Sequence, residues 1–216
     1  MKKDLTELVF ILDRSGSMSG LESDTIGGYN SMMEKQKKEP GEALVTTVLF
    51  DDGYELLHDR TNLRGVEAIT NKEYFVRGTT ALLDAIGKTI NKIGNAQKQT
   101  AESERAEKVI FVITTDGMEN ASREYNYETI KKMVENQKNK HGWEFIFLGA
   151  NIDAVAEARR FGISEDRAAR FNSDPKGTSL NYEVVGEAVK NLRASKTVDR
   201  NWKARVEEDY KERGDK

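Results

Sequence analysis

The apolar run at residues 109–113 (Val-Ile-Phe-Val-Ile) constrains the fold more than any other part of the chain. Its β-branched and aromatic residues favour a strand, and the side chains on both sides of that strand are apolar. Such a strand is typical of the centre of a parallel sheet that is covered by helices on both faces. We therefore expect an α/β fold with this run in the middle of the sheet.

Other apolar runs alternate with amphipathic helical segments along the chain, as they do in layered α/β proteins. The turn Asp51-Asp52-Gly53 favours a hairpin, so the strand after it should be antiparallel and lie at the sheet edge. Residues 61–77 have a weak pattern, which predicts a short helix and a loop. The predicted strands are residues 8–11, 43–50, 54–58, 109–113, 145–148 and 168–171, and the predicted helices are residues 21–33, 82–93, 127–134, 154–161 and 184–192.

The composition excludes several classes of protein. The chain of 216 residues has no cysteine, which rules out disulfides, thiolate zinc sites and cysteine nucleophiles. Its 34 basic and 37 acidic residues nearly balance, so no overall basic field favours nucleic acid. The apolar run near the N-terminus is too short for a signal peptide or a membrane span. We therefore expect a cytoplasmic protein that binds neither nucleic acid nor a membrane.

The most informative polar motif is Asp13-x-Ser15-x-Ser17, which follows the first predicted strand. Open α/β sheets bind their ligands at the carboxyl ends of strands. One carboxylate and two hydroxyls on alternate residues of a tight glycine-containing loop can converge on a hard cation. Helix capping alone would need only one of the three side chains. The motif therefore predicts a metal site rather than a hydrolytic site.

Two further loops carry oxygen ligands. Thr79 and Thr80 precede a predicted helix, and Asp116 follows the most apolar strand. If the first strand and the 109–113 strand are neighbours, Asp13 and Asp116 flank the crevice in which such sheets bind ligands. Each feature has a simpler explanation by itself, because threonine is a good helix N-cap and Asp-Gly is an ordinary turn. Their order and spacing together favour a single site.

The combination resembles the von Willebrand factor type A (VWA) domain, and specifically its metal-ion-dependent adhesion site (MIDAS). In that family an Asp-x-Ser-x-Ser loop, a threonine on a second loop and an aspartate on a third bind a divalent cation, usually Mg²⁺. Thr80 suits the family's spacing to the following helix better than Thr79, which stays an alternative. The resemblance thus implies the metal ligands Asp13, Ser15, Ser17, Thr80 and Asp116.

The resemblance also implies the architecture. It predicts a Rossmann-like, doubly wound, mostly parallel sheet of order 3-2-1-4-5-6, with strand 3 antiparallel and helices on both faces. The VWA domain is expected to span residues 1–195, and residues 196–216 are expected to form a charged helical tail that packs on the domain or extends from it. In this tail Val198, Trp202, Val206 and Tyr210 are spaced by four, which favours a docked helix.

The residue types suggest protein binding. Only two of the expected ligands are carboxylates, so the cation is poorly neutralised and favours one more anionic oxygen from outside. In the VWA family that oxygen comes from a carboxylate of the partner protein. We therefore expect a module that captures an Asp or Glu of a protein partner through Mg²⁺, with Mn²⁺ or Ca²⁺ as alternatives. A cytoplasmic scaffold or assembly role is the expected setting.

The competing hypothesis is a magnesium-dependent phosphoryl-transfer enzyme, or a phosphoacceptor, that uses Asp13. Ser15 stands where such sites place a second aspartate as acid or base, and the chain has no phosphate-binding glycine-rich loop. The histidines, His58 and His141, are both expected on the surface. These features favour a protein that is not an enzyme.

Four polar residues near the expected site have more than one interpretation. Asp51 and Asp52 could lie at its rim, but a polar hairpin turn explains them more simply. Glu119 and Asn120 are close enough in sequence to Asp116 to reach waters on a bound metal. The sequence leaves this use of Glu119 and Asn120 open.

Overall fold

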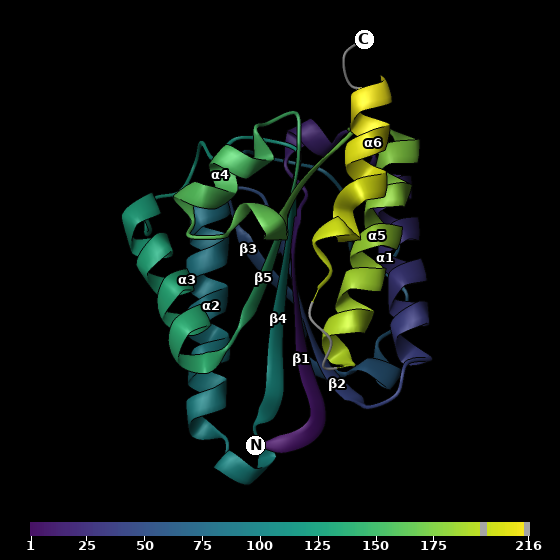
Figure 1. Ribbon diagram of the computed structural model, residues 1–216. Coiled ribbons are helices and arrows are strands. Elements are labelled where there is room, and N and C mark those ends of the chain that lie inside the picture. The colour runs from purple at the N-terminus through teal and green to yellow at the C-terminus, as the bar shows by residue number, and fades with distance from the viewer. Residues whose placement is uncertain (195–197, 214–216) are drawn as a thin grey trace.

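The computed structural model describes residues 1–194 and 198–213, so the predicted boundary at residues 195–196 lies outside the described residues. One sheet has the order β3-β2-β1-β4-β5-β6 (Figure 1), with β3 antiparallel to β2 and every other neighbouring pair parallel. These features confirm the predicted fold class, strand order and antiparallel edge strand. The strands are β1 (Lys2–Asp13), β2 (Glu42–Phe50), β3 (Tyr54–Asn62), β4 (Ala106–Thr115), β5 (Glu144–Ala150) and β6 (Ala168–Phe171).

Helices cover both faces of the sheet, as Figure 1 shows. One layer consists of α2 (Leu82–Gln99), α3 (Tyr127–His141) and α4 (Ala154–Arg160). The other consists of α1 (Glu22–Lys37), α5 (Pro175–Arg193) and α6 (Ala204–Arg213). No helix in the described part of the chain has the length and apolar character needed to cross a membrane.

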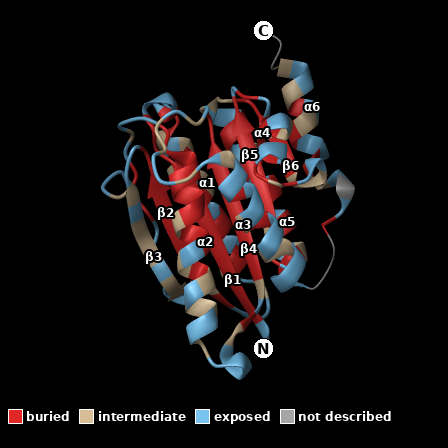
Figure 2. Cartoon of the chain, turned by 90° about the vertical axis from the view of Figure 1, so that its left-hand side faces the viewer, coloured by how far each residue is buried: buried red, intermediate tan, exposed pale blue. Residues whose placement is uncertain are grey.

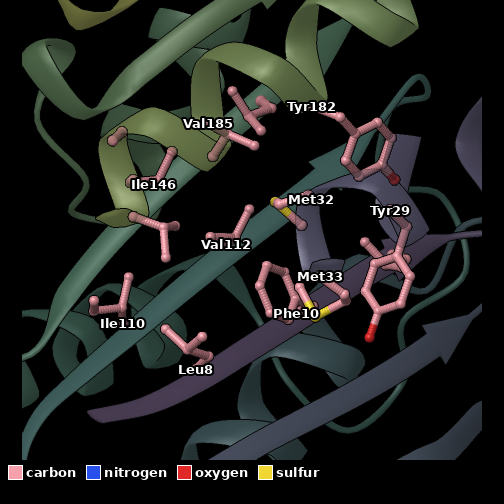
Figure 3. Packing of buried hydrophobic residues seen from close by; sticks show 14 of the residues in the cluster. Leu8, Phe10, Tyr29, Met32, Met33, Ile110, Val112, Ile146, Tyr182 and Val185 are labelled. Carbon is pink, nitrogen blue, oxygen red and sulfur yellow. The ribbon is translucent and has the colours of Figure 1, made fainter. Parts of the chain in front are cut away.

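The central strands β1, β4 and β5 are buried along most of their length, whereas β3 is half-buried at the edge (Figure 2). Successive side chains of a strand point to opposite faces, so each strand contributes to two cores. Phe10 and Val112 pack with Met32 of α1 and Val185 of α5 (Figure 3). Phe111 lies in the cluster beneath α2 and α3. This double burial explains why the 109–113 run has no polar face.

Most elements extend beyond their predicted ranges, and two of these differences have an identifiable cause or consequence. β3 continues to Asn62, so the predicted short helix and loop at residues 61–77 begin with strand and a single 3₁₀ turn. Helix α5 starts at Pro175, before the predicted start at residue 184. Asp174 caps this helix by accepting a hydrogen bond from the backbone N–H of Gly177 at 2.7 Å. An aspartate cap followed by proline is a local start signal that hydrophobic spacing alone does not contain.

The C-terminal segment packs beside α5 and β6. Val198 and Val206 of the predicted apolar stripe are buried, and Trp202 packs partly buried against the same core. Asn172 donates hydrogen bonds from Nδ2 to the backbone oxygen (3.0 Å) and Oδ2 (2.9 Å) of Asp209 in α6. The segment is thus fixed by apolar burial on one side and by polar contacts on the other.

Candidate metal centre

The candidate site lies where β1 and β4, which are parallel neighbours, reach the same edge of the sheet. The strand order reverses between these two strands, and β1 ends at Asp13 while β4 ends at Thr115. Side chains from positions far apart in sequence therefore meet at one edge. Thr115 donates a hydrogen bond from Oγ1 to Oδ2 of Asp13 at 2.5 Å, which joins the two strand ends directly.

Asp13 is held from several directions and is only 1% exposed. Its Oδ1 accepts a hydrogen bond from the backbone N–H of Ser15 at 2.7 Å, and Tyr74 donates from its hydroxyl to the Asp13 backbone oxygen at 2.5 Å. Burial raises the pKa of Asp13 from 3.8 to about 6, although hydrogen bonds from Ser15 and Thr115 oppose the rise. Because burial removes this carboxylate from bulk water, its ionised form would be stabilised by a bound cation rather than by solvent.

Ser15, Ser17 and Asp116 form a chain of oxygens. Ser15 Oγ lies 3.0 Å from Ser17 Oγ, and Ser17 Oγ donates to Asp116 Oδ1 at 2.5 Å. The other oxygen of this carboxylate, Asp116 Oδ2, is buried and has no hydrogen-bond partner. Burial also raises the pKa of Asp116, although the bond from Ser17 opposes the rise. An unpartnered buried carboxylate oxygen is costly, and a bound cation would remove that cost.

Thr80 joins this group from the second loop. It is 3% exposed, whereas Thr79 is exposed. A Cβ atom placed on Gly117 would lie 3.1 Å from Ser17 Oγ and 3.4 Å from Thr80 Oγ1, so both hydroxyls flank this glycine. Thr80 is the threonine that the spacing in the VWA family favoured over Thr79. Metal ligation by either threonine stays a prediction.

Glu119 and Asn120 brace the second loop against the third. Asn120 Oδ1 accepts from the backbone N–H of Thr80 at 2.9 Å, and the Asn120 N–H donates to the Thr80 carbonyl at 3.0 Å. Glu119 Oε2 accepts from the N–H of Leu83 in the first turn of α2 at 2.9 Å. In the opposite direction, the carboxylate of Asp84 in α2 accepts hydrogen bonds from the backbone N–H groups of residues 123–125, each at 3.0 Å. These bonds fix the orientation of Thr80 relative to Asp116.

The sequence analysis missed an ion-pair cluster behind the first loop. Arg14, at the variable position of the motif, is fully buried and donates from Nε to Asp51 Oδ2 at 2.9 Å. Arg77 donates from Nε to the same oxygen at 2.7 Å. Asp51 also forms the expected hairpin turn, because its Oδ1 accepts a hydrogen bond from the Gly53 N–H at 2.6 Å. Its side chain is nevertheless buried, with an exposed fraction of 1%.

The charges of this cluster act on one another. Burial tends to raise the pKa of Asp51, but hydrogen bonds from Arg77 and Gly53 and the charge of Arg14 lower it below its usual value. No local signal marked this pair, because β1 ends at Asp13 and the alternation of a strand does not extend to Arg14. A buried arginine there requires a carboxylate partner.

Comparisons with solved structures identify the fold. No family model matches the chain, and no curated protein matches its sequence. Proximal thread matrix protein 1 from the mussel byssus is similar over 86% of this chain and 46% of its own, with 17% identity and a TM-score of 0.60. The ArnB paralog VWA2 of Sulfolobus acidocaldarius covers 87% of this chain and 45% of its own, with 18% identity and a TM-score of 0.54. A von Willebrand factor type A structure from Catenulispora acidiphila covers 86% and 42%, with 13% identity and a TM-score of 0.56. The chain has a VWA fold.

The chain spans less than half the length of these three structures. The structural similarity establishes the VWA fold, and at identities of 13–18% the function of each whole protein is a property of that protein alone. A second structure of the mussel protein has zinc in its MIDAS motif, with 16% identity and a TM-score of 0.58. That observation concerns a protein of the same fold as the present chain.

The donor atoms of this VWA fold suit a hard divalent cation. They are carboxylate and hydroxyl oxygens, which Mg²⁺ prefers. No group of three or more His, Cys, Asp or Glu side chains that could hold a metal occurs among the described residues. A cation at this edge would therefore depend on the hydroxyls of Ser15, Ser17 and Thr80 as well as on Asp13 and Asp116. Ser17 is exposed, so the site is open to solvent on that side.

The histidines lie away from this site. His141 is exposed at the end of α3, where the sequence placed it. The surface prediction for His58 is wrong, because this side chain is half-buried with Nδ1 3.0 Å from Thr47 Oγ1. Burial lowers the pKa of His58. Its contacts are with β2 and with Tyr29, so the ring packs in the sheet rather than beside Asp13.

Proposed function

We propose that this chain is a divalent-cation-dependent protein-binding module that captures a carboxylate of its partner at the edge of the sheet. The observation that carries the proposal is Asp116 Oδ2, a buried carboxylate oxygen without a hydrogen-bond partner, beside the hydroxyls of Ser17 and Thr80. Asp13, Ser15, Ser17, Thr80 and Asp116 would hold the cation.

Mg²⁺ is the proposed cation, and Mn²⁺ and Ca²⁺ are alternatives with the same preference for oxygen ligands. A zinc-occupied MIDAS motif in a structurally similar protein supports divalent-metal binding by this fold. A bound cation would supply a positive charge that attracts an anionic oxygen of the partner. Asp13 and Asp116 would supply the negative charge that holds the cation. The hydroxyls of Ser15, Ser17 and Thr80 would be neutral ligands that add no charge.

The proposed partner group is an Asp or Glu side chain of another protein. With two carboxylates and neutral hydroxyls as its ligands, the cation keeps an affinity for one more anion. Ser17 is exposed while Asp13 and Asp116 are buried, so an incoming side chain would approach from the Ser17 side. This geometry supports capture of a group that projects from a partner surface.

We propose binding rather than phosphoryl transfer because both oxygens of Asp13 already accept hydrogen bonds, from Ser15 and Thr115. A nucleophilic carboxylate needs an oxygen directed at the phosphorus, and Asp13 is 1% exposed. Incubation with acetyl phosphate followed by intact-mass measurement tests this alternative. A stable or transient adduct on Asp13 would favour the phosphoacceptor hypothesis.

A cytoplasmic scaffold or assembly role is the setting that we propose for this module. The absence of cysteine fits a reducing compartment, and the near balance of basic and acidic residues disfavours nucleic acid as the partner. Co-purification from cell extract in Mg²⁺ and in EDTA tests the role, because an assembly partner should depend on the cation.

The decisive experiment is calorimetric titration of Mg²⁺ into the wild-type protein and into Asp116→Asn. The substitution keeps the size of the side chain and removes its charge, so we expect the affinity to fall about tenfold or more. Asp153→Asn is a matched control, because Asp153 is an exposed helix N-cap and asparagine caps equally well. Equal Mg²⁺ affinity in all three proteins would contradict the proposal.

A further inference from the structure

A segment without helix or strand, residues 66–78, lies against the first loop of the candidate metal centre. Among the described residues, three hydrogen bonds join this segment to the loop. Two of them connect backbone groups, the Arg77 N–H to the Arg14 carbonyl (2.9 Å) and the Gly16 N–H to the Gly78 carbonyl (3.1 Å). The third comes from a side chain, because Tyr74 donates from its hydroxyl to the Asp13 carbonyl at 2.5 Å. A substitution at Tyr74 can therefore remove this contact without altering the backbone.

The Asp13 carbonyl lies at the end of β1, where pairing with the neighbouring strands ends. The chain then enters the first loop, and the Ser15 N–H donates back to Asp13 Oδ1 at 2.7 Å. The peptide group that follows Asp13 thus connects the carboxylate and the hydroxyl that are both proposed to hold the cation. A hydrogen bond to its carbonyl oxygen fixes the plane of this peptide group, and with it the relative position of Asp13 and Ser15.

Tyr74 is itself held in place. Its side chain is fully buried in the hydrophobic cluster under α1 and α5. Its backbone N–H donates to the Thr70 carbonyl at 2.9 Å, which closes a turn. Glu73 stabilises this turn, because its Oε2 accepts from the Thr70 N–H and from the Thr70 hydroxyl, both at 2.7 Å. Close packing around the ring then leaves the Tyr74 hydroxyl little freedom of position.

Asn30 of α1 holds the segment immediately before this turn. Its Nδ2 donates to the Ile69 carbonyl at 2.8 Å, and its Oδ1 accepts from the Ile69 N–H at 2.9 Å. One side chain thus satisfies both backbone groups of a buried residue that belongs to no helix or strand. A continuous series of contacts therefore runs from α1 through residues 69–74 to Asp13.

We propose that Tyr74 is a positioning residue of the candidate metal centre, whose hydroxyl orients the Asp13 peptide group so that Asp13 and Ser15 bind one cation. The inference rests on the proposed function, because Tyr74 acts through two of the proposed ligands. Residues that orient metal ligands typically change metal affinity about 10–100-fold when they are lost. Tyr74 should therefore control metal affinity although it is not a ligand.

Three buried tyrosines provide a matched test, and two of them are visible in Figure 3. Tyr74→Phe removes the bond to Asp13. Tyr29→Phe removes a bond of the same kind, to Thr47 Oγ1 of β2 at 2.7 Å, and Tyr182→Phe removes a hydroxyl without a hydrogen-bond partner among the described residues. In calorimetric titration with Mg²⁺, we expect the affinity to fall about tenfold in Tyr74→Phe and to stay unchanged in the other two.

Urea denaturation in EDTA separates positioning from stability. Tyr29→Phe and Tyr74→Phe each lose one buried hydrogen bond, so their denaturation midpoints should fall by similar amounts. A difference between them in Mg²⁺ affinity then has its origin in the metal site and not in general destabilisation.

Hydrogen exchange of the metal-free protein gives a readout that does not depend on bound Mg²⁺. In EDTA the Ser15 amide, which donates to Asp13 Oδ1, should exchange about tenfold faster in Tyr74→Phe than in wild type, and Tyr29→Phe should leave it unchanged. Asn30→Ala repeats the test from the other end of the contact series, and should change affinity and exchange in the same direction. Ser31→Ala, at the exposed neighbouring position of α1, should change neither.

The outcomes distinguish this inference from the proposed function. If wild type binds Mg²⁺ and Tyr74→Phe binds it equally well, the inference is wrong and the proposed function stands. The same holds if Tyr29→Phe loses as much affinity as Tyr74→Phe, or if the Ser15 amide exchanges alike in Tyr74→Phe and wild type. If the wild-type protein binds no divalent cation, both proposals are wrong.

Discussion

Replacing Asp13 with asparagine should stabilise the metal-free protein. Burial raises the pKa of this carboxyl from 3.8 to about 6, so at pH 7 its ionised form is less favourable in the folded than in the unfolded chain. Since each tenfold change in an equilibrium constant corresponds to about 1.4 kcal/mol, ionisation of Asp13 lowers the free energy of unfolding by about 3 kcal/mol. Asparagine has no charge and removes this cost.

The hydrogen bonds around residue 13 can survive the substitution. An asparagine Oδ1 can still accept from the Ser15 N–H, and its Nδ2 can donate to Thr115 Oγ1. Thr115 can then direct its own proton to the Gly117 carbonyl, which lies 3.1 Å away. Asp13→Asn should therefore gain most of the 3 kcal/mol, estimated at about 1.4 kcal/mol per pKa unit, rather than lose it to broken contacts.

The difference in stability between wild type and Asp13→Asn should depend on pH. The folded pKa lies above the unfolded pKa, so the wild-type protein has its full stability from this group below pH 3.8 and loses it as the pH rises through about 6. The free energy of unfolding of Asp13→Asn should exceed that of wild type by about 3 kcal/mol at pH 7 and by less than about 1 kcal/mol at pH 4. Urea denaturation in EDTA measures it, with Asp153→Asn as the control.

Saturating Mg²⁺ should make the wild-type protein more stable than Asp13→Asn. Wild type should gain stability with Mg²⁺ concentration because the cation binds only the folded state, and Asp13→Asn should gain far less. The reasoning fails if Asp13→Asn is less stable than wild type in EDTA at pH 7, or if the difference does not change with pH.

Three further predictions concern the supports of the site. Asn120→Ala should weaken Mg²⁺ binding about tenfold by freeing the second loop, with the exposed Asn139→Ala unchanged in the same calorimetry. Gly78→Ala should cost about 1–3 kcal/mol in urea denaturation, because Gly78 has φ +66° and a Cβ would collide with a neighbouring carboxylate, whereas Gly65→Ala should be neutral. Asp51→Asn should cost about 3 kcal/mol at pH 7, because it removes the buried carboxylate between Arg14 and Arg77 and leaves Arg14 only the half-exposed Glu55 as an ion-pair partner. Because the pKa of Asp51 is lowered, that stabilisation is present above pH 3.8 and is lost as the pH falls below it, so the two proteins should converge in acid.

The strands and the site loops were predictable because each carries a local signal. The 109–113 run is apolar on both sides, and the Asp13 motif directly follows a strand. The order of the strands came from the family resemblance, since pairing depends on contacts between distant segments. Thr80 could be preferred over Thr79 only through the family's spacing.

What the sequence did not yield depends on contacts across the fold. Nothing adjacent to Arg14 shows that its charge is neutralised by Asp51, because their partnership is created by the pairing of β1 with β2. Likewise Asn120 has no local feature that assigns its side chain to the Thr80 backbone. Such contacts between a side chain and a distant backbone leave no periodic pattern in the sequence.

The distance along the chain between the candidate ligands has a consequence for folding. Ser17 and Asp116, which share a hydrogen bond, are 99 positions apart, and they meet only after β1 has paired with β4. We expect this long-range closure to come late in folding, because its entropy cost precedes the contacts that it makes. A cation held by these residues would therefore find no complete site in the unfolded chain or in early intermediates. It should slow the unfolding of the native protein while leaving the rate of folding nearly unchanged.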